Sequence, residues 1–274
     1  MAEEKLPLSL NPITLDLSWQ DPEDNLARIR SQVAIRLKKN PKADPEEQLF
    51  LFPELTLTGF VTEDPPSYAV EPPHAHLEAL SAIAKENRTA IAAGFPEANP
   101  DDENKPFNTM ILIGPDGLPV ARYRKTHLFT WGENSESKSY ASGTGGIVAS
   151  YRGWSVGFAT CFDIRFPPLF HAYAKEAVDL ILVSACWIGG PHKTYQFKTI
   201  NSGHAILSQA FVAAVNRCGR DPFFHYDGAE YLFSPFGEDL YAKVPCRLDP
   251  RELDDARKLT VRPSDRAVYA IRRV

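Results

Sequence analysis

The apolar positions of the chain recur in two patterns, one typical of amphipathic helices and one typical of buried strands. Residues 21–40 show the first: an Asp-Pro pair and two acidic residues open the segment, apolar residues follow at helical spacing, and an Asn-Pro pair closes it. Residues 48–52 show the second, a short apolar run that ends at Pro53, as expected of a strand buried on both faces. The same patterns predict further helices at 74–86, 167–176 and 194–210, and further strands at 90–94, 109–113, 120–123, 147–151, 155–160, 179–184 and 211–215. Strands and helices that alternate in this way predict α/β layers in which helices cover the sheets.

Composition and charge narrow the class of protein. The 274 residues are 43% hydrophobic and 24% charged, as in ordinary globular proteins, so intrinsic disorder is excluded. Lys and Arg number 30 against 35 Asp and Glu, a net charge of −5, so we expect neither nucleic acid nor an acidic membrane surface as a partner. No apolar stretch approaches the roughly 18 residues of a membrane span. We expect a single domain over residues 1–274, with its core at about 10–245 and a charged C-terminal tail at about 249–274.

The cysteines and the N-terminal segment indicate a cellular compartment. Four cysteines are widely spaced, with no Cys-x-x-Cys pair, which argues against a zinc ribbon, a thioredoxin motif or a secreted disulfide framework. The first residues lack the basic flank and apolar core of a signal peptide. His74 and His76 have no further ligands at a suitable spacing, so we expect no metal site. A cytoplasmic protein with reduced thiols is the expectation.

Three reactive residue types each follow a predicted strand. Glu54 follows the run at 48–52, Lys125 follows the second arm of a hairpin turned by Pro-Asp-Gly, and Cys161 follows the strand at 155–160. Catalytic groups of α/β proteins often lie beyond strand ends. Taken singly, however, each has a plain structural interpretation: a solvated turn acid, a surface lysine and a small buried hydrophobe.

The local sequence around these three residues changes that balance. Phe-Pro-Glu54-Leu-Thr-Leu-Thr-Gly-Phe, Tyr-Arg-Lys125-Thr-His-Leu-Phe and Thr-Cys161-Phe-Asp-Ile-Arg-Phe-Pro occur in this order. All three segments resemble the signatures of the nitrilase superfamily of carbon–nitrogen hydrolases, and the segment at 15–26 is similar to the start of its ω-amidase-like branch. The resemblance covers about residues 10–245. It implies a four-layer αββα sandwich, a Glu54–Lys125–Cys161 catalytic triad, and a homodimer or higher homo-oligomer.

The implied chemistry is amide hydrolysis without a metal or organic cofactor. Cys161 attacks the carbonyl as a thiolate, which the Lys125 ammonium favours, while Glu54 accepts the thiol proton. Lys125 and the backbone N–H of Phe162 hold the oxyanion. Glu54 then protonates the departing ammonia and activates the water that cleaves the thioester.

Further residues are candidates by the same resemblance. Glu136 matches a second glutamate that positions the lysine and the substrate, although Glu133 lies three residues away and a solvated loop acid is the alternative. Arg165 either forms a core salt bridge or frames the pocket. Trp187 either lines the pocket or is a core or interface aromatic. The candidates for substrate binding or specificity are Phe162, Arg165, Trp187, Tyr140 and Tyr195.

One segment departs from the family pattern. Residues 204–208 read His-Ala-Ile-Leu-Ser where the family often reads Arg-Ala-x-Glu-Asn, which predicts an altered polar network near the site or the dimer face. This departure motivates the alternative of a catalytically idle relative that binds a metabolite or a protein partner. A papain-like dyad of Cys161 with His127 or His204 is a further alternative, but the Cys-Phe-Asp turn does not resemble that class.

The expected function is therefore an amidohydrolase that cleaves a small linear amide to a carboxylate and ammonia through a cysteine thioester. Within the superfamily we favour an ω-amidase-like activity on the ω-amide of a 2-oxo dicarboxylate. A nitrilase, or another carbon–nitrogen hydrolase of the superfamily, is the alternative. The expected partner is a small-molecule amide, with no nucleic acid and no membrane.

Overall fold

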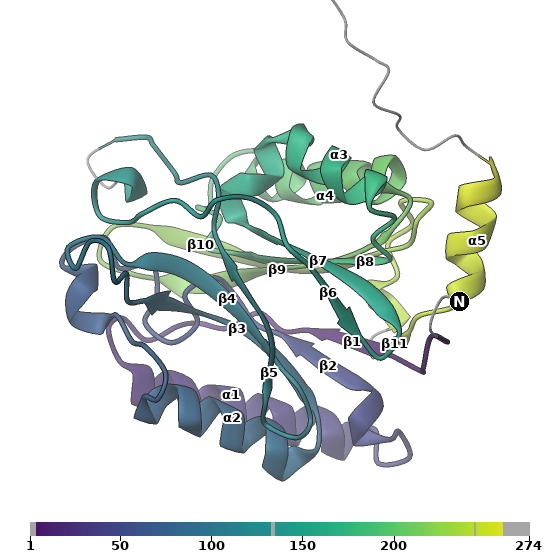
Figure 1. The fold of residues 1–274 in the computed structure, drawn as a ribbon, viewed down its shortest axis with the longest axis horizontal. Helices are drawn as coiled ribbons and strands as arrows, with labels where there is room; N and C mark the ends of the chain where they lie inside the picture. Colours follow the sequence, from purple (N-terminus) through teal and green to yellow (C-terminus); the bar gives the residue numbers. More distant parts are fainter. Residues whose placement is uncertain (1–3, 133–134, 244, 260–274) are drawn as a thin grey trace, which may run out of the picture.

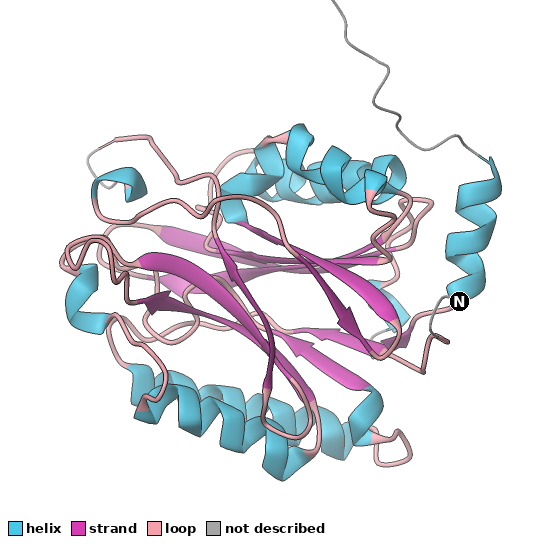
Figure 2. Cartoon of the chain, viewed as in Figure 1, coloured by secondary structure: helices cyan, strands magenta, loops and turns pink. Residues whose placement is uncertain are grey.

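Two β-sheets lie face to face between two pairs of helices in the computed structural model, which describes residues 4–132, 135–243 and 245–259 (Figures 1 and 2). The first sheet has the strand order β11 (Cys246–Arg247), β1 (Ser9–Pro12), β2 (Gln48–Leu51), β3 (Ala90–Glu97), β4 (Phe107–Ile113) and β5 (Pro119–Arg124). The second has the order β10 (His225–Phe233), β9 (Phe211–Arg220), β8 (Leu180–Ala185), β7 (Trp154–Thr160) and β6 (Val148–Tyr151). The helices are α1 (Pro22–Lys39), α2 (Ala75–Asn87), α3 (Pro167–Lys175) and α4 (Lys193–Ser208), with α5 (Pro250–Leu259) at one end. The predicted αββα sandwich is confirmed.

Parallel pairing gives each sheet a set of strand ends that point in one direction. In the first sheet, β1, β2 and β3 are parallel and β4 and β5 continue antiparallel. In the second, β7, β8 and β9 are parallel, with antiparallel β6 and β10 at the edges. Loops that leave the carboxyl ends of such strands collect at one edge of a sheet, which is where α/β proteins place their sites.

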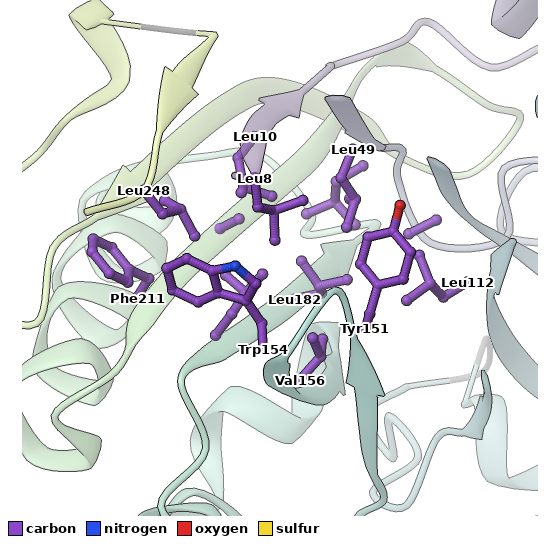
Figure 3. Close-up of a cluster of buried hydrophobic side chains, with 14 of the residues drawn as sticks. Leu8, Leu10, Leu49, Leu112, Tyr151, Trp154, Val156, Leu182, Phe211 and Leu248 are labelled. Carbon is purple, nitrogen blue, oxygen red and sulfur yellow. The ribbon is translucent and has the colours of Figure 1, made fainter. Parts of the chain in front are cut away.

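The hydrophobic core fills three layers. Between the sheets, Leu49 and Leu112 of the first sheet are buried with Val156 and Leu182 of the second (Figure 3). Separate clusters lie under α1 and α2 and under α3 and α4. Successive strand residues face opposite layers, so strands of this fold are apolar on both sides. This explains the uninterrupted apolar runs from which the strands were predicted.

The first helix shows how local sequence sets an element. The Asp21 carboxylate accepts the backbone N–H of Asp24, and Pro22 occupies the first turn. The face that carries Ile29 and Val33 is wholly buried. The helix predicted at 21–40 is thus confirmed, and it ends where Asn40 caps the last turn.

Four elements escaped prediction because their sequences are short or polar: β1, β10, β11 and α5. β10 is an edge strand whose residues are mostly exposed or half-buried, with burial at Tyr226 and at its end, and it is held mainly by its ladder with β9. α5 buries only Leu253 and Ala256 among its apolar residues. The Arg257 guanidinium ties α5 to the body by bonding Asp179 and the carbonyls of Ala177 and Val178. The described part of the charged tail therefore packs on its own chain, while residues 260–274 lie outside the described residues.

Across the described ranges, no helix combines the length and the apolar character that crossing a bilayer requires.

Candidate active site

Side chains from both sheets meet at the carboxyl ends of their strands. Glu54 follows β2, Lys125 follows β5 and Cys161 follows β7, while Glu136 begins the short 3-10 turn Glu136–Lys138. Glu54, Lys125 and Glu136 are each fully buried. The fold thus brings Lys125 together with Glu54, which lies 71 positions away in the sequence, and with Glu136, which lies 11 positions away.

The Lys125 ammonium lies between two carboxylates. Its Nζ is 2.7 Å from Glu54 Oε1 and 2.6 Å from Glu136 Oε2. Burial by itself would lower the pKa of Lys125, but Glu136 and Glu54 outweigh it and raise that pKa well above its usual value. The lysine therefore stays charged, and two of its three N–H donors are engaged by the carboxylates.

The two carboxylates are held by further donors. Asn108 Nδ2 lies 2.7 Å from Oε1 of Glu54 and 2.7 Å from Oε1 of Glu136. The backbone N–H of Cys186 donates to Glu54 Oε2 at 2.7 Å, and that of Phe129 donates to Glu136 Oε2 at 2.9 Å. Burial first, and then the charge of Glu54, raise the pKa of the Glu136 carboxyl, while Lys125 opposes them. Charge-assisted bonds of this number offset much of the cost of burying the carboxylates.

Asn108 and Cys186 were not among the residues predicted from the sequence. Cys186 had a usable signal, because it follows the predicted strand at 179–184 just as Glu54 and Cys161 follow theirs. Asn108 had a weaker one, a polar residue directly before the apolar run at 109–113.

Close backbone packing sets the position of Glu54. A Cβ at Gly94 in β3 would lie 2.3 Å from the backbone nitrogen of Leu55, so only glycine permits this approach. Leu55 has a φ of 45°, in the left-handed region that residues other than glycine seldom adopt. The turn that carries Glu54 is therefore held in a strained shape by the strand beneath it.

The turn that begins at Cys161 is fixed by one buried carboxylate. Cys161 has a φ of 47° and opens the 3-10 segment Cys161–Arg165. Asp163 accepts the backbone N–H of Thr160 and the hydroxyl of Tyr123, both at 2.8 Å. It also accepts the backbone N–H of His127 at 2.8 Å. Asp163 thus links the Cys161 turn to the segment that carries Lys125.

The electrostatic surroundings of Cys161 shift the pKa of its thiol in opposing directions. Burial first, and then the Glu54 carboxylate, raise the pKa of the Cys161 thiol well above its usual value, and Lys125 lowers it only in part. The Lys125 charge thus favours the thiolate, as expected from the sequence, while burial and the Glu54 charge act in the opposite direction. Such a thiol needs a base at the moment of attack rather than prior ionisation.

A cavity of about 50 Å³ opens on Cys161, Lys125 and Cys186. Aromatic side chains form part of its walls, among them Phe162 and Trp187. The other lining residues are Phe60, Phe129, Arg165, Ile188 and Lys193. The small volume fits a substrate with few heavy atoms.

Two tyrosines considered from the sequence lie elsewhere. Tyr140 is buried outside the cavity lining, and its hydroxyl donates to the carbonyl of Val61 at 2.7 Å. Tyr195 is 70% exposed and does not line the cavity. Glu133, the alternative to Glu136, lies outside the described residues.

Two cationic side chains lie close to the Trp187 ring at the wall of the cavity. The Arg165 guanidinium lies 4.7 Å from the Trp187 ring centre, and Lys193 Nζ lies 5.8 Å from it. Arg165 also donates to Gln196 Oε1 at 2.8 Å, so it frames the cavity rather than forming a core salt bridge. Within residues 4–132, 135–243 and 245–259, no carboxylate forms an ion pair with Arg165 or Lys193.

The histidines do not complete a cysteine–histidine dyad. His127 Nδ1 contacts Asp163 Oδ1 at 2.8 Å, and neither His127 nor His204 lines the cavity. His74 caps α2 by accepting the backbone N–H of His76. Among the residues that the structure describes, no group of three or more His, Cys, Asp or Glu side chains is placed to hold a metal ion.

His204 occupies the segment that departs from the family pattern. Its ring stacks on Phe170 with centres 3.5 Å apart, and its Nε2 lies 2.8 Å from the carbonyl oxygen of Ile164. The histidine thus packs α4 onto α3 and onto the turn that follows Cys161. An aromatic contact and one hydrogen bond are thus formed by this segment, which lacks the Arg, Glu and Asn of the family pattern.

His204 should make stability depend on pH. Burial lowers its pKa below the usual value, and the bond to the Ile164 carbonyl opposes this only in part. The unfolded chain therefore binds a proton near pH ~6.5, where folded His204 remains neutral. We expect the free energy of unfolding to fall as pH drops below about 6.5 and through the lowered pKa, and His204→Phe to lose less stability over this range than the wild type.

Urea unfolding between pH 7.5 and 5 measures this difference. The matched control is His171→Phe, which replaces an exposed histidine of α3. Parallel losses in the wild type and His204→Phe would show that another group is responsible.

Comparison with known proteins places this site in a family. The carbon–nitrogen hydrolase family model matches residues 10–244. Two hydrolases of Mycobacterium tuberculosis are 33% identical to the chain over 173 residues, which is 62% of this chain and only 60% of their own length. The 2-oxoglutaramate amidase of Bacillus subtilis is 25% identical over 232 residues, 85% of each chain.

A solved structure supports the fold. It is a mutant of the amidase from Nesterenkonia sp. AN1, with covalent addition of the acetamide moiety of fluoroacetamide at the active-site cysteine. It superposes with a TM-score of 0.74 at 22% identity, over 88% of this chain and 87% of that one. With the sandwich fold and the family match over residues 10–244, the chain belongs to the carbon–nitrogen hydrolase family.

Proposed function

We propose that this chain hydrolyses a small linear amide to a carboxylate and ammonia through a thioester on Cys161. One observation carries the proposal: the Lys125 ammonium, held between two buried carboxylates, lines the same cavity as the Cys161 thiol. A thiol and a cation that share a cavity, with a carboxylate bonded to the cation, are the parts that acyl transfer requires. The amidases among the relatives support the same reaction class.

In the first half of the reaction, Glu54 takes the proton from Cys161 as its sulfur bonds to the amide carbon. The carbonyl oxygen becomes an oxyanion, which the third N–H of Lys125 and the backbone N–H of Phe162 hold. Glu54 then gives its proton to the amide nitrogen, the carbon–nitrogen bond breaks, and ammonia leaves. The thioester on Cys161 remains.

In the second half, Glu54 takes a proton from water as the water oxygen bonds to the thioester carbon. The carbon–sulfur bond then breaks, the acid product leaves, and Glu54 returns the proton to the Cys161 sulfur. Glu136 contributes by holding the Lys125 ammonium as its second carboxylate partner. Since burial raises the pKa of the Cys161 thiol, Glu54 takes up each proton as a new bond forms.

The cavity wall indicates the substrate class. Arg165 and Lys193 present positive charge beside Trp187 without a carboxylate partner among the described residues. Guanidinium and ammonium groups bind carboxylates through charge-assisted hydrogen bonds. A substrate with an amide at one end and a carboxylate at the other matches both ends of the site. We therefore favour the ω-amide of a short dicarboxylate or 2-oxo dicarboxylate.

Ammonia release from a panel of compounds tests this substrate class. We expect 2-oxoglutaramate to be hydrolysed with a lower KM than neutral butyramide. Arg165→Met and Lys193→Met should raise KM for 2-oxoglutaramate about 10–100-fold, the loss of one charged hydrogen bond, with little change for butyramide. Lys198→Met is the matched control, because Lys198 lies on the same helix as Lys193 but is paired with Asp239.

Other outcomes of the panel favour the alternatives. Turnover of butyronitrile alone would indicate a nitrilase. If Arg165→Met raises KM equally for 2-oxoglutaramate and butyramide, Arg165 stabilises the cavity wall and does not bind a substrate carboxylate. No turnover of any compound, and no thioester mass on Cys161, would favour a catalytically idle binding protein. The homodimer stays a prediction.

A further inference from the structure

One buried asparagine contacts both carboxylates of the carboxylate–lysine cluster through its side chain and the main chain of Lys125 through its backbone. Asn108 begins the buried part of β4 and is 1% exposed. Its Nδ2 lies 2.7 Å from Glu54 Oε1 and 2.7 Å from Glu136 Oε1, and its backbone oxygen accepts the N–H of Lys125 at 2.8 Å. Carboxylates accept hydrogen bonds and do not donate them, so the nitrogen of the amide must face the two acids. Each of its two hydrogens serves one carboxylate.

The donors around Glu54 are divided unequally between its two oxygens. Oε1 accepts from both Lys125 Nζ and Asn108 Nδ2. From the residues that the structure describes, Oε2 accepts only the backbone N–H of Cys186. A carboxylate oxygen offers about two acceptor positions, so Oε1 is filled and Oε2 keeps one free. The free position is where a further proton can be bound.

We propose that Asn108 is a positioning residue that makes Oε2 of Glu54 the atom exchanging protons with Cys161. By filling Oε1, the amide leaves one basic position on Glu54, and by bonding Glu136 as well it closes a ring with Lys125. This inference rests on the proposed amide hydrolysis for its role in turnover, but the arrangement of Glu54 toward Cys161 is independent of the substrate.

The residue type suits this task. A second cation at position 108 would neutralise the carboxylates and weaken Glu54 as a base. A carboxylate there would repel both acids. A neutral amide supplies two donors without changing the charge of the cluster, and its short side chain on a strand allows little movement.

Asn108→Ala and Asn108→Asp test the proposal. Asn108 does not line the cavity, so we expect kcat for 2-oxoglutaramate to fall by about 10²-fold, the usual effect of a small misplacement, with KM little changed. With a donor removed, the carboxylate pair should bind protons more readily, and the acidic limb of the kcat/KM profile should move to higher pH. The same shift should appear in the rate at which iodoacetamide alkylates Cys161, followed by mass spectrometry without substrate.

Asn11→Ala is the matched control, because Asn11 is equally buried and bonds one side chain, that of Gln48, in the same sheet. It should lose stability while both pH profiles keep their wild-type shape. The proposal is overturned if Asn108→Ala loses activity only in proportion to its folded fraction, with unchanged profiles for hydrolysis and alkylation.

The alkylation measurement separates the two proposals. If the wild type hydrolyses no amide but Asn108→Ala still shifts the alkylation profile, the proposed function fails and the positioning of Glu54 by Asn108 stands. If the wild type hydrolyses amides and the alkylation profile does not shift, the positioning role fails and the proposed function stands.

Discussion

Replacing Cys161 by alanine is expected to abolish amide hydrolysis, with a loss of about 10⁴-fold or more in kcat. The sulfur is the atom that forms the thioester, and neither Glu54 nor Lys125 can take its place as the nucleophile. In the wild type, rapid mixing with substrate should add the acyl mass to the peptide that contains Cys161. Ammonia release and intact-protein mass spectrometry measure the two effects.

Cys218→Ala controls for the loss of a thiol elsewhere in the chain. Cys218 lies in β9, is partly exposed and does not line the cavity, so its variant should keep both activity and the acyl adduct. A Cys161→Ala enzyme that still releases ammonia at a comparable rate would show that water attacks the amide directly.

Replacing Lys125 by methionine is expected to destroy activity and to destabilise the fold by about 3–5 kcal/mol, the usual result of removing one partner from a buried ionic group. Glu54 and Glu136 would remain buried without their cation. Since lowering the pH protonates carboxylates, the deficit in unfolding free energy should shrink as pH falls from 8 to 5. Urea unfolding at several pH values measures this change.

Two variants make the Lys125 result specific. Lys125→Met combined with Glu136→Gln removes one of the unpaired charges and should recover part of the stability without recovering activity. Lys198→Met breaks the half-exposed pair with Asp239 and should change stability by under about 1 kcal/mol. If Lys125→Met loses as little stability as Lys198→Met, then water or a second charge must compensate the two carboxylates left without their cation.

Helices and central strands were predictable because their signals are local. The helix at 21–40 carries its own cap and stop, and the strand at 48–52 is apolar throughout because both of its faces are buried. β10 was missed because it is a partly exposed edge strand without a continuous apolar run, and α5 was missed because its partners lie far along the chain. β10 depends on its ladder with β9, and α5 on the bonds of Arg257 to the loop before β8.

The candidate site divides in the same way. Glu54, Lys125 and Cys161 were predicted from their local sequences and from their positions after strands. Asn108 was not, because nothing in a strand of apolar residues shows that one amide will face two carboxylates from distant loops. The placement of Tyr140 behind the cavity was equally inaccessible to sequence reasoning.

The amino-acid sequence by itself determined the family and the layered fold and indicated the candidate reactive residues, because these depend on local patterns that survive without coordinates. Only the tertiary structure decided how those residues are arranged. It placed the Lys125 ammonium between two buried carboxylates, buried the Cys161 thiol so that its pKa is raised, and divided the hydrogen-bond donors unequally between the two oxygens of Glu54. Each depends on burial and on the distances between side chains from separate strands, and such distances exist only once the two sheets have packed together.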